Sequence, residues 1–295
     1  MNPVSTSFDQ TRHRHGILLM VFSTFCFAAN ALMIRALGTV QAVDVWFLAS
    51  IRFITGLGLI LLLYRTGPDG FQPRHLYRRP RLIARGIVGA LGVYIYYLTI
   101  VKLGAGRAAF INNTYVIMGA LLAVLMLGER FRRSVALGGF FALTGLALLT
   151  NAFGTGVGIS FYDWIAIVGA LGSAYVIVTI RQLHAEGEHT STIFGAQCSY
   201  GLLLCLGPAL FNWSAPDAIV WLLIVASAFC SGAGQISMTR AFRDLPVGEG
   251  SLLQMLVPLG IAVGGVILFG EQHTATELLG AALILGGTAW PTVRR

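Results

Sequence analysis

Two side-chain amides lie at corresponding depths of two long apolar stretches, and their chemistry suits a polar metabolite. Asn112 lies near the middle of residues 106–127, and Gln254 lies near the middle of residues 247–269. An amide carries donors and an acceptor, so two amides facing one cavity would hydrogen-bond both the ammonium and the carboxylate of a zwitterion. The alternative is that each amide joins two helices, at about 0.6 kcal/mol per hydrogen bond. We predict that both residues bind substrate.

Tyrosine rings form the second group of candidate binding residues. Tyr94 and Tyr97 are three residues apart within the apolar stretch 82–103, so they share one face of a helix, and Tyr175 lies in the stretch 161–183. Aromatic walls suit apolar or aromatic substrates and also hold a cation over a ring face. The alternative is an aromatic belt at the membrane surface, which would include Tyr97 before the others. The predicted set of substrate-binding residues is completed by Tyr115, Gln235 and Asn30. For Asn30, packing between helices is an equally good explanation.

Pro258 and Arg52 are unusual residues for the interior of an apolar helix. Pro258 lies within the stretch 247–269 and removes a backbone donor there, which predicts a kink that takes part in gating or exposes a carbonyl group to substrate. The alternative is a kink that neighbouring helices satisfy. Arg52 would meet a substrate carboxylate, but we favour a structural tie to backbone carbonyls. Glu129 and Glu271 each close an apolar stretch, and we interpret both as structural.

Several kinds of chemistry lack their residues in this sequence. None of the 12 acidic residues lies in the middle of an apolar stretch, and all six histidines fall in predicted tails or loops, so a buried proton relay is not indicated. The motifs of ATP-binding loops, zinc proteases and serine hydrolases are missing. The four cysteines show no CxxC and no histidine at ligand spacing. We therefore expect no catalytic residues, no metal, no cofactor and no enzymatic activity.

The composition is that of a membrane protein. Of the 295 residues 56% are hydrophobic and only 11% are charged, and the mean hydropathy is +0.76. The net charge of +8 does not indicate a nucleic-acid partner, because the basic residues lie between apolar stretches. Each stretch must be helical, since a backbone in lipid has to satisfy its own hydrogen bonds. The predicted fold is an all-α integral membrane protein with ten transmembrane helices, near residues 16–38, 43–64, 82–103, 106–127, 134–152, 161–183, 191–211, 217–239, 247–269 and 274–291.

Basic residues predict how these helices are oriented. Most of the 20 Lys and Arg residues fall on one side if the amino terminus lies inside, as positively charged loops do. Both termini are therefore predicted to be cytoplasmic, in a multi-pass protein of the cell inner membrane. No small-residue cleavage pattern follows a short apolar core, so we expect the first stretch to be retained as a helix.

The sequence also repeats itself at a distance of 142 residues. Without a gap this shift aligns Gly106 with Gly248, and the Gly-Glu pair at 128–129 with the pair at 270–271. Residues 1–150 and 151–295 are thus predicted to be two five-helix repeats. Five is an odd number, so the second repeat must enter the membrane from the opposite side. The segment ERFRR after the first Gly is basic whereas its counterpart EQHTA is not, which agrees with an inverted repeat around a central cavity.

Ten apolar stretches, a five-plus-five duplication and a Gly-Glu pair after the fourth and ninth stretches are similar to the drug/metabolite transporter superfamily. The chain resembles its ten-helix exporters, and its length and aromatic residues resemble the aromatic-amino-acid exporters. The resemblance covers essentially the whole chain and implies export of amino acids, related metabolites or cationic compounds. It also implies a cavity lined mainly by helices 1, 3, 4, 6, 8 and 9.

The predicted function is therefore a secondary transporter that exports amino acids, with broad specificity for aromatic and other neutral ones, and related small metabolites by alternating access. Its partners would be a small-molecule substrate and the lipid bilayer, and it would act as a monomer. The first alternative is efflux of cationic drugs such as quaternary ammonium compounds. The absence of a mid-span Asp or Glu counts against it. The second is a membrane-embedded enzyme acting on lipid-linked substrates, for which no cluster of nucleophiles or metal ligands is visible.

Overall fold

The computed structural model describes residues 3–40, 43–67, 69–130, 132–152, 159–211 and 216–293. These ranges form thirteen α-helices and contain no β-strand beyond one isolated bridge between Thr66 and Phe71. The helices are α1 (Pro3–Val40), α2 (Val45–Leu63), α3 (Pro73–Arg78), α4 (Pro80–Leu103), α5 (Ala105–Asn113), α6 (Tyr115–Leu127), α7 (Arg133–Leu149), α8 (Phe161–Ala185), α9 (Thr190–Phe211), α10 (Ala218–Asp244), α11 (Val247–Gln254), α12 (Leu256–Phe269) and α13 (Ala275–Val293).

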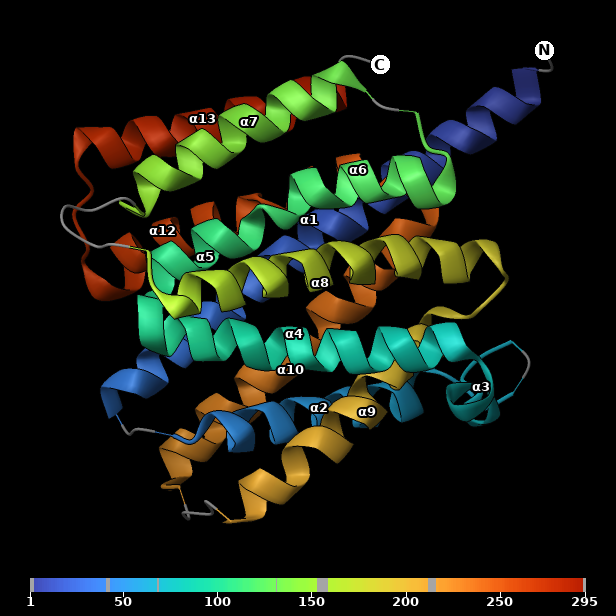
Figure 1. Ribbon diagram of the computed structural model, residues 1–295, viewed down its shortest axis with the longest axis horizontal. Helices are drawn as coiled ribbons and strands as arrows, with labels where there is room; N and C mark the ends of the chain where they lie inside the picture. Colours follow the sequence, from blue (N-terminus) through green and yellow to red (C-terminus); the bar gives the residue numbers. More distant parts are fainter. Residues whose placement is uncertain are drawn as a thin grey trace.

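The long helices run side by side along the longest axis of the molecule (Figure 1). α7 and α13 lie together along one edge of the bundle, and α2 and α9 lie near the opposite edge. The chain enters α1 and leaves α13 at the same end, where α3 also lies. We call this end the terminal end and the other the distal end.

The all-helical membrane fold predicted from composition is confirmed. Each of the ten apolar stretches corresponds to one helix or to a pair of consecutive short helices. Within the described residues eight segments are long and apolar enough to cross a membrane, and α7 is a shorter apolar helix. The number of ten spans and their inverted arrangement stay predictions. The eight segments are Gln10–Leu37, Val45–Leu63, Pro80–Ile100, Gly106–Leu127, Phe161–Ala185, Thr190–Phe211, Ala218–Asp244 and Val247–Phe269.

Two of these segments are broken near the same position of the 142-residue repeat. The first break lies at Thr114, between α5 and α6, and the second at Met255, between α11 and α12. In the first, side chains compete for backbone carbonyls: Thr114 donates to Ile111 O at 2.7 Å, and Asn113 donates to Ala109 O at 2.8 Å. The second lies three residues before the predicted kink at Pro258, whose missing N–H cannot bond to the carbonyl four residues earlier.

Glycines let α7 and α13 approach until their backbones touch. A β-carbon on Gly145 would lie 2.5 Å from the carbonyl oxygen of Gly280, and one on Gly280 would lie equally close to the oxygen of Gly145. Gly138 and Gly287 contact each other in the same way, about two turns further along the same two helices. Because low numbers on one helix meet high numbers on the other, the two helices are antiparallel. Small residues at such a crossing are typical of membrane helices, where close backbone packing drives association.

Enlarging one of these glycines is expected to destabilise the protein. In Gly287→Ala the new methyl group would lie 2.6 Å from the oxygen of Gly138, so the helices must separate, at about 1–3 kcal/mol. Its neighbour Gly286 has open space around it, and Gly286→Ala is the matched control. Thermal unfolding in detergent should show a lower midpoint for the first variant only. Equal midpoints for both variants would contradict the close crossing.

Candidate functional site

The first half of the chain (residues 1–150) meets the second half (residues 151–295) where α5 and α6 pack against α8, which we call the first interface. At its distal end Arg107 donates to Asp163 at 2.7 Å. Halfway along, Ser173 Oγ donates to Asn112 Oδ1 at 3.5 Å, close to the break at Thr114. This interface therefore carries a polar contact at mid-depth and an ion pair at its distal end.

The terminal end of the first interface is the most heavily bonded. Arg181 Nε lies 2.5 Å from Glu129 Oε1, and another nitrogen of Arg181 donates to Leu245 O at 2.6 Å and to Phe242 O at 3.2 Å. Glu129 Oε2 in turn accepts the backbone N–H of Val247 at 3.1 Å. The ion pair thus joins α6, α8 and the junction between α10 and α11.

The second interface lies where α11 and α12 pack against α1. At the terminal end His13 Nε2 lies 2.8 Å from Glu249 Oε1, and the Glu249 side chain is only 1% exposed. Halfway along, Gln254 Nε2 donates to Ser23 Oγ at 3.1 Å, next to the break at Met255. The second interface therefore also combines an end contact with a mid-depth amide.

At the distal end of the second interface, Arg35 pairs with Glu271 and lies 4.6 Å from the ring centre of Phe269. The hydrogen bond from Arg35 lowers the pKa of the Glu271 carboxyl below its ordinary value. A carboxyl with a lowered pKa stabilises its pair above the ordinary value and loses that contribution as pH falls through the lowered one. The distal pair is therefore ionised at neutral pH.

Charged residues that the sequence shift aligns lie at opposite ends of the two interfaces (Figure 1). The 142-residue shift aligns Arg107 with Glu249, Asn112 with Gln254, and Glu129 with Glu271. The arginine partners of the two Glu residues share the motif I-R-x-L, at residues 34–37 on α1 and 180–183 on α8. Yet Glu129 lies at the terminal end and Glu271 at the distal end. Each end of the bundle therefore has one contact from each interface.

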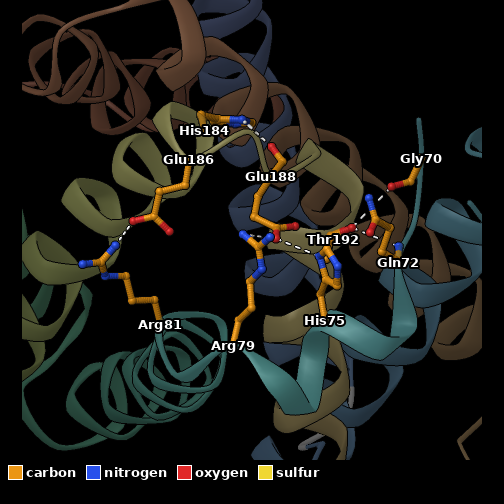
Figure 2. Close-up of polar contacts among 9 residues, drawn as sticks. All are labelled: Gly70, Gln72, His75, Arg79, Arg81, His184, Glu186, Glu188 and Thr192. Carbon is orange, nitrogen blue, oxygen red and sulfur yellow. Dashed lines mark hydrogen bonds and ion pairs between the residues drawn. The ribbon is translucent and has the colours of Figure 1, made fainter. Parts of the chain in front are cut away.

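A further set of contacts at the terminal end joins α3 and the start of α4 to the loop between α8 and α9 (Figure 2). Glu188, whose side chain is 1% exposed, lies 2.8 Å from His75 and 2.7 Å from Arg79. Arg81 pairs with Glu186 of the same loop. These pairs also connect the two halves of the chain. Within the described residues, the terminal end thus holds more ion pairs between the halves than the distal end.

The predicted polar residues occupy two kinds of place. Asn112 and Gln254 lie at mid-depth as expected, but each takes a serine of the other half as its partner. Gln235 is buried on α10, beside Ser231, whose hydroxyl is fully buried without a hydrogen-bond partner. Asn30 is half-buried on α1.

The predicted tyrosines do not gather at one point. Tyr94 stacks on Trp46 with ring centres 4.0 Å apart, and the hydroxyl of Tyr97 accepts a hydrogen bond from Arg52 at 3.4 Å. Tyr115 packs against two hydrophobic clusters just after the break in the first interface. Tyr175 is half-buried on α8, and its backbone carbonyl accepts from Thr179.

Two expectations from the sequence need correction. All six histidines are expected in tails or loops, but α1 begins at Pro3, and this places His13 and His15 on a helix, His13 against a buried carboxylate. His75 and His184 also lie on helices, α3 and α8. The I-R-x-L arginines, Arg35 and Arg181, were not among the predicted site residues. The repeated motif was the signal that would have found them, and the 142-residue shift hides it because these two arginines are 146 residues apart.

A comparison with known families decides the class of protein. The sequence model of the EamA-like transporter family matches residues 14–151 and, a second time, residues 160–292. The chain belongs to the EamA-like transporter family. This EamA-like protein is a multi-pass membrane transporter and not an enzyme. The predicted transport class is thereby confirmed.

Individual relatives of this EamA-like transporter cover nearly its whole length. The pseudopaline exporter CntI of Pseudomonas aeruginosa is 27% identical over 92% of this chain and 94% of its own. An uncharacterized transporter of Helicobacter pylori is 22% identical over 92% of each chain. One crystal structure covers 95% of this chain and 99% of its own with a TM-score of 0.76 at 19% identity, which shows the same fold.

Proposed function

We propose that this transporter exports amino acids and related small metabolites by alternating access between two inverted halves, residues 1–150 and 151–295, in a bacterial inner membrane. The observation that carries the proposal is the reversed equivalence of the two interfaces. If the halves rock against each other, contacts at one end separate while those at the other end stay closed. Each end has its own set of ion pairs to hold it shut.

Two observations support the inverted repeat. The family model matches the chain twice, once in each half. The antiparallel crossing of α7 and α13 joins glycines that are themselves related by the repeat, since Gly138 corresponds to Gly280 and Gly145 to Gly287. Gly138 contacts Gly287, the equivalent of Gly145, and Gly145 contacts Gly280, the equivalent of Gly138. A two-fold axis between the two helices would produce this reciprocal pair of contacts.

The substrate class is drawn from the mid-depth polar groups. Asn112 and Gln254 offer donors and acceptors next to the broken helices, where transporters place their substrates. One relative is named as an exporter of pseudopaline, and we therefore include small metabolites other than amino acids among the proposed substrates. Efflux of cationic drugs is the less favoured candidate, because the described middle of the helices holds no unpaired carboxylate to meet a cation.

The test is transport by the purified protein in liposomes. Counterflow of radiolabelled amino acids, measured with and without a pH gradient, should detect at least one substrate and show how transport is driven. Thiol labelling of single cysteines placed after Glu129 and after Glu271 should reach them from opposite sides of the membrane, the first from the cytoplasm. Labelling of both positions from the same side would overturn the inverted arrangement, and lack of flux for every amino acid would overturn the substrate class.

Removing either mid-depth amide is expected to impair this transport. Asn112→Ala and Gln254→Ala each delete a group that would hydrogen-bond a charged end of the substrate, so flux should fall about tenfold. The thermal midpoint in detergent should change little, because Asn112 loses one long hydrogen bond to Ser173 and Gln254 loses only its bonds to Ser23 and to the sulfur of Met20. A variant that loses flux only because it unfolds would show that its amide serves packing.

A further inference from the structure

Arg52 carries a charge at mid-depth of a membrane-spanning helix. It lies seven residues after the start of α2 and eleven before its end, which is about 10 Å and 16 Å at 1.5 Å per residue. Its side chain is half-buried. In the described part of the chain the guanidinium makes one hydrogen bond, a long one of 3.4 Å to the hydroxyl of Tyr97, and has no carboxylate partner. A charge at this depth is costly unless something compensates it.

Four other arginines of the helices differ from Arg52 in their partners. Arg35, Arg107 and Arg181 lie near helix ends, and each pairs with a carboxylate. Arg85 has no carboxylate partner among the described residues, but it is completely buried and donates to the amide oxygen of Gln197 at 3.0 Å. A ligand has no access to Arg85. Among these five arginines, Arg52 is the one that has no strong partner within the described residues and is also accessible.

The helix geometry directs Arg52 into the bundle. The lipid-exposed side of α2 is marked by Ile54 and Leu61, which are 47% and 62% exposed. At about 100° per residue, Arg52 points about 160° away from Ile54 and about 180° away from Leu61. Its hydrogen bond to Tyr97 on α4 confirms this direction. The charge therefore faces the interior instead of the lipid.

The surfaces of α2 and α4 around Arg52 are aromatic. Trp46 of α2 stacks on Tyr94 of α4 with ring centres 4.0 Å apart and planes 20° from parallel. Tyr94 shares a helix face with Tyr97, the partner of Arg52. A planar guanidinium matches a carboxylate with two parallel hydrogen bonds, and aromatic rings beside it suit an apolar or aromatic group.

We propose that Arg52 binds the carboxylate of the transported substrate, with the Trp46–Tyr94 pair beside its apolar part. This assigns Arg52 a binding role in place of the structural tie expected from the sequence. A tie to backbone carbonyls would satisfy the guanidinium within the protein, whereas its hydrogen bond here goes to a phenol at long range. The inference rests on the proposed transport function and narrows its substrates to carboxylates, which excludes simple cationic drugs.

The experiment compares ligands that differ only in the carboxylate. Liposomes containing the full chain are offered phenylalanine, tryptophan and histidine, each beside its α-amide, with choline as a cation that has no carboxylate. The wild type should prefer at least one acid over its amide by about tenfold or more, the ratio for a charge-assisted hydrogen-bonded pair. Arg52→Gln should reduce this preference to about twofold, and Arg52→Lys should restore part of it because the charge returns without the planar fork.

Lys102→Gln is the matched control, because it removes one positive charge from an exposed position at the end of α4. Its preference for acids should equal that of the wild type. Equal transport of acids and amides, or an Arg52→Gln variant that keeps the preference, would overturn the role of Arg52 while leaving the transporter proposal intact. Transport of choline alone would overturn both the role of Arg52 and the amino-acid substrate class. Lack of flux for every compound would overturn both the amino-acid proposal and this one.

Discussion

Replacing Arg181 with Gln is expected to open the terminal end of the bundle about tenfold more often. Opening that end requires α6 to move away from α8, and Arg181 opposes this through its 2.5 Å pair with Glu129 and its bonds to two backbone carbonyls. The arginine is 29% exposed and the glutamate 18%, so the pair lies between a surface and a buried one. A contribution of about 1–2 kcal/mol corresponds to roughly five- to thirtyfold in the equilibrium.

A cysteine in the middle of the first interface can report this opening. Ser173→Cys places a thiol at mid-depth of α8, and a membrane-impermeant thiol reagent is added from one side at a time. Arg181→Gln should raise labelling from the terminal side and lower it from the distal side. Of the four native cysteines, Cys26, Cys198 and Cys205 are buried and Cys230 is half-buried, and the protein without the reporter gives their background. Arg130→Gln removes the same charge at the same end from an exposed side chain and should leave labelling unchanged.

An unchanged labelling pattern in Arg181→Gln would show that the pair with Glu129 serves stability alone. A matching shift in Arg130→Gln would show that net charge near the membrane surface, and not this ion pair, sets the equilibrium. The charge-exchanged variant that combines Glu129→Arg with Arg181→Glu offers a second check, since an interaction between the two side chains predicts partial recovery.

The sequence is sufficient to predict the helices of this fold because the bilayer imposes a length on every span. Each apolar stretch corresponds to a helix or a broken helix, and the break near Pro258 was foreseen to within three residues. The break at Thr114 was not foreseen, because it depends on side-chain bonds from Asn113 and Thr114 to the preceding turn. Such bonds compete with the helix only weakly, and no proline marks the position.

The partners of the candidate site were harder to predict than its members. Asn112 and Gln254 were found because one shift aligns them, but Ser173 and Ser23 are not aligned by that shift. The helices that supply the partners follow a longer spacing, since Arg35 and Arg181 are 146 residues apart and Ser23 and Ser173 are 150 apart. A change in loop length between repeats leaves the packing intact while it removes the sequence alignment. A comparison that aligns the two halves with one fixed shift therefore misses these contacts between them.

Arg52 shows a different limit of sequence reasoning. Its depth was evident from the sequence, but whether a guanidinium is satisfied depends on what surrounds it. The paired arginines and Arg85 are equally plain in the sequence, and only the positions of Gln197 and of the carboxylates separate them from Arg52. The decisive property is that Arg52 is accessible and, within the described residues, makes only one long hydrogen bond, to Tyr97, which no local pattern encodes.

Replacing Arg35 with Gln is expected to act in the opposite sense to Arg181→Gln. Arg35 holds α1 to Glu271 at the distal end, so its loss should raise labelling of the Ser173→Cys reporter from the distal side and lower it from the terminal side. The pair is more exposed than its counterpart, at 43% and 33%, and the expected shift is smaller, about threefold. Lys102→Gln, which removes a charge near the same end, should leave the labelling ratio unchanged.

The combination of both substitutions tests the mechanism more strictly than either alone. The two pairs lie at opposite ends of the bundle and share no side chain, so their free energies should add. If each pair closes one end of a single rocking motion, their losses oppose each other. In the variant that combines Arg35→Gln with Arg181→Gln, the ratio of terminal-side to distal-side labelling should then be about three times that of the wild type, instead of about ten times. Two independent local openings would instead raise labelling from both sides at once, and that result would contradict alternating access by rigid halves.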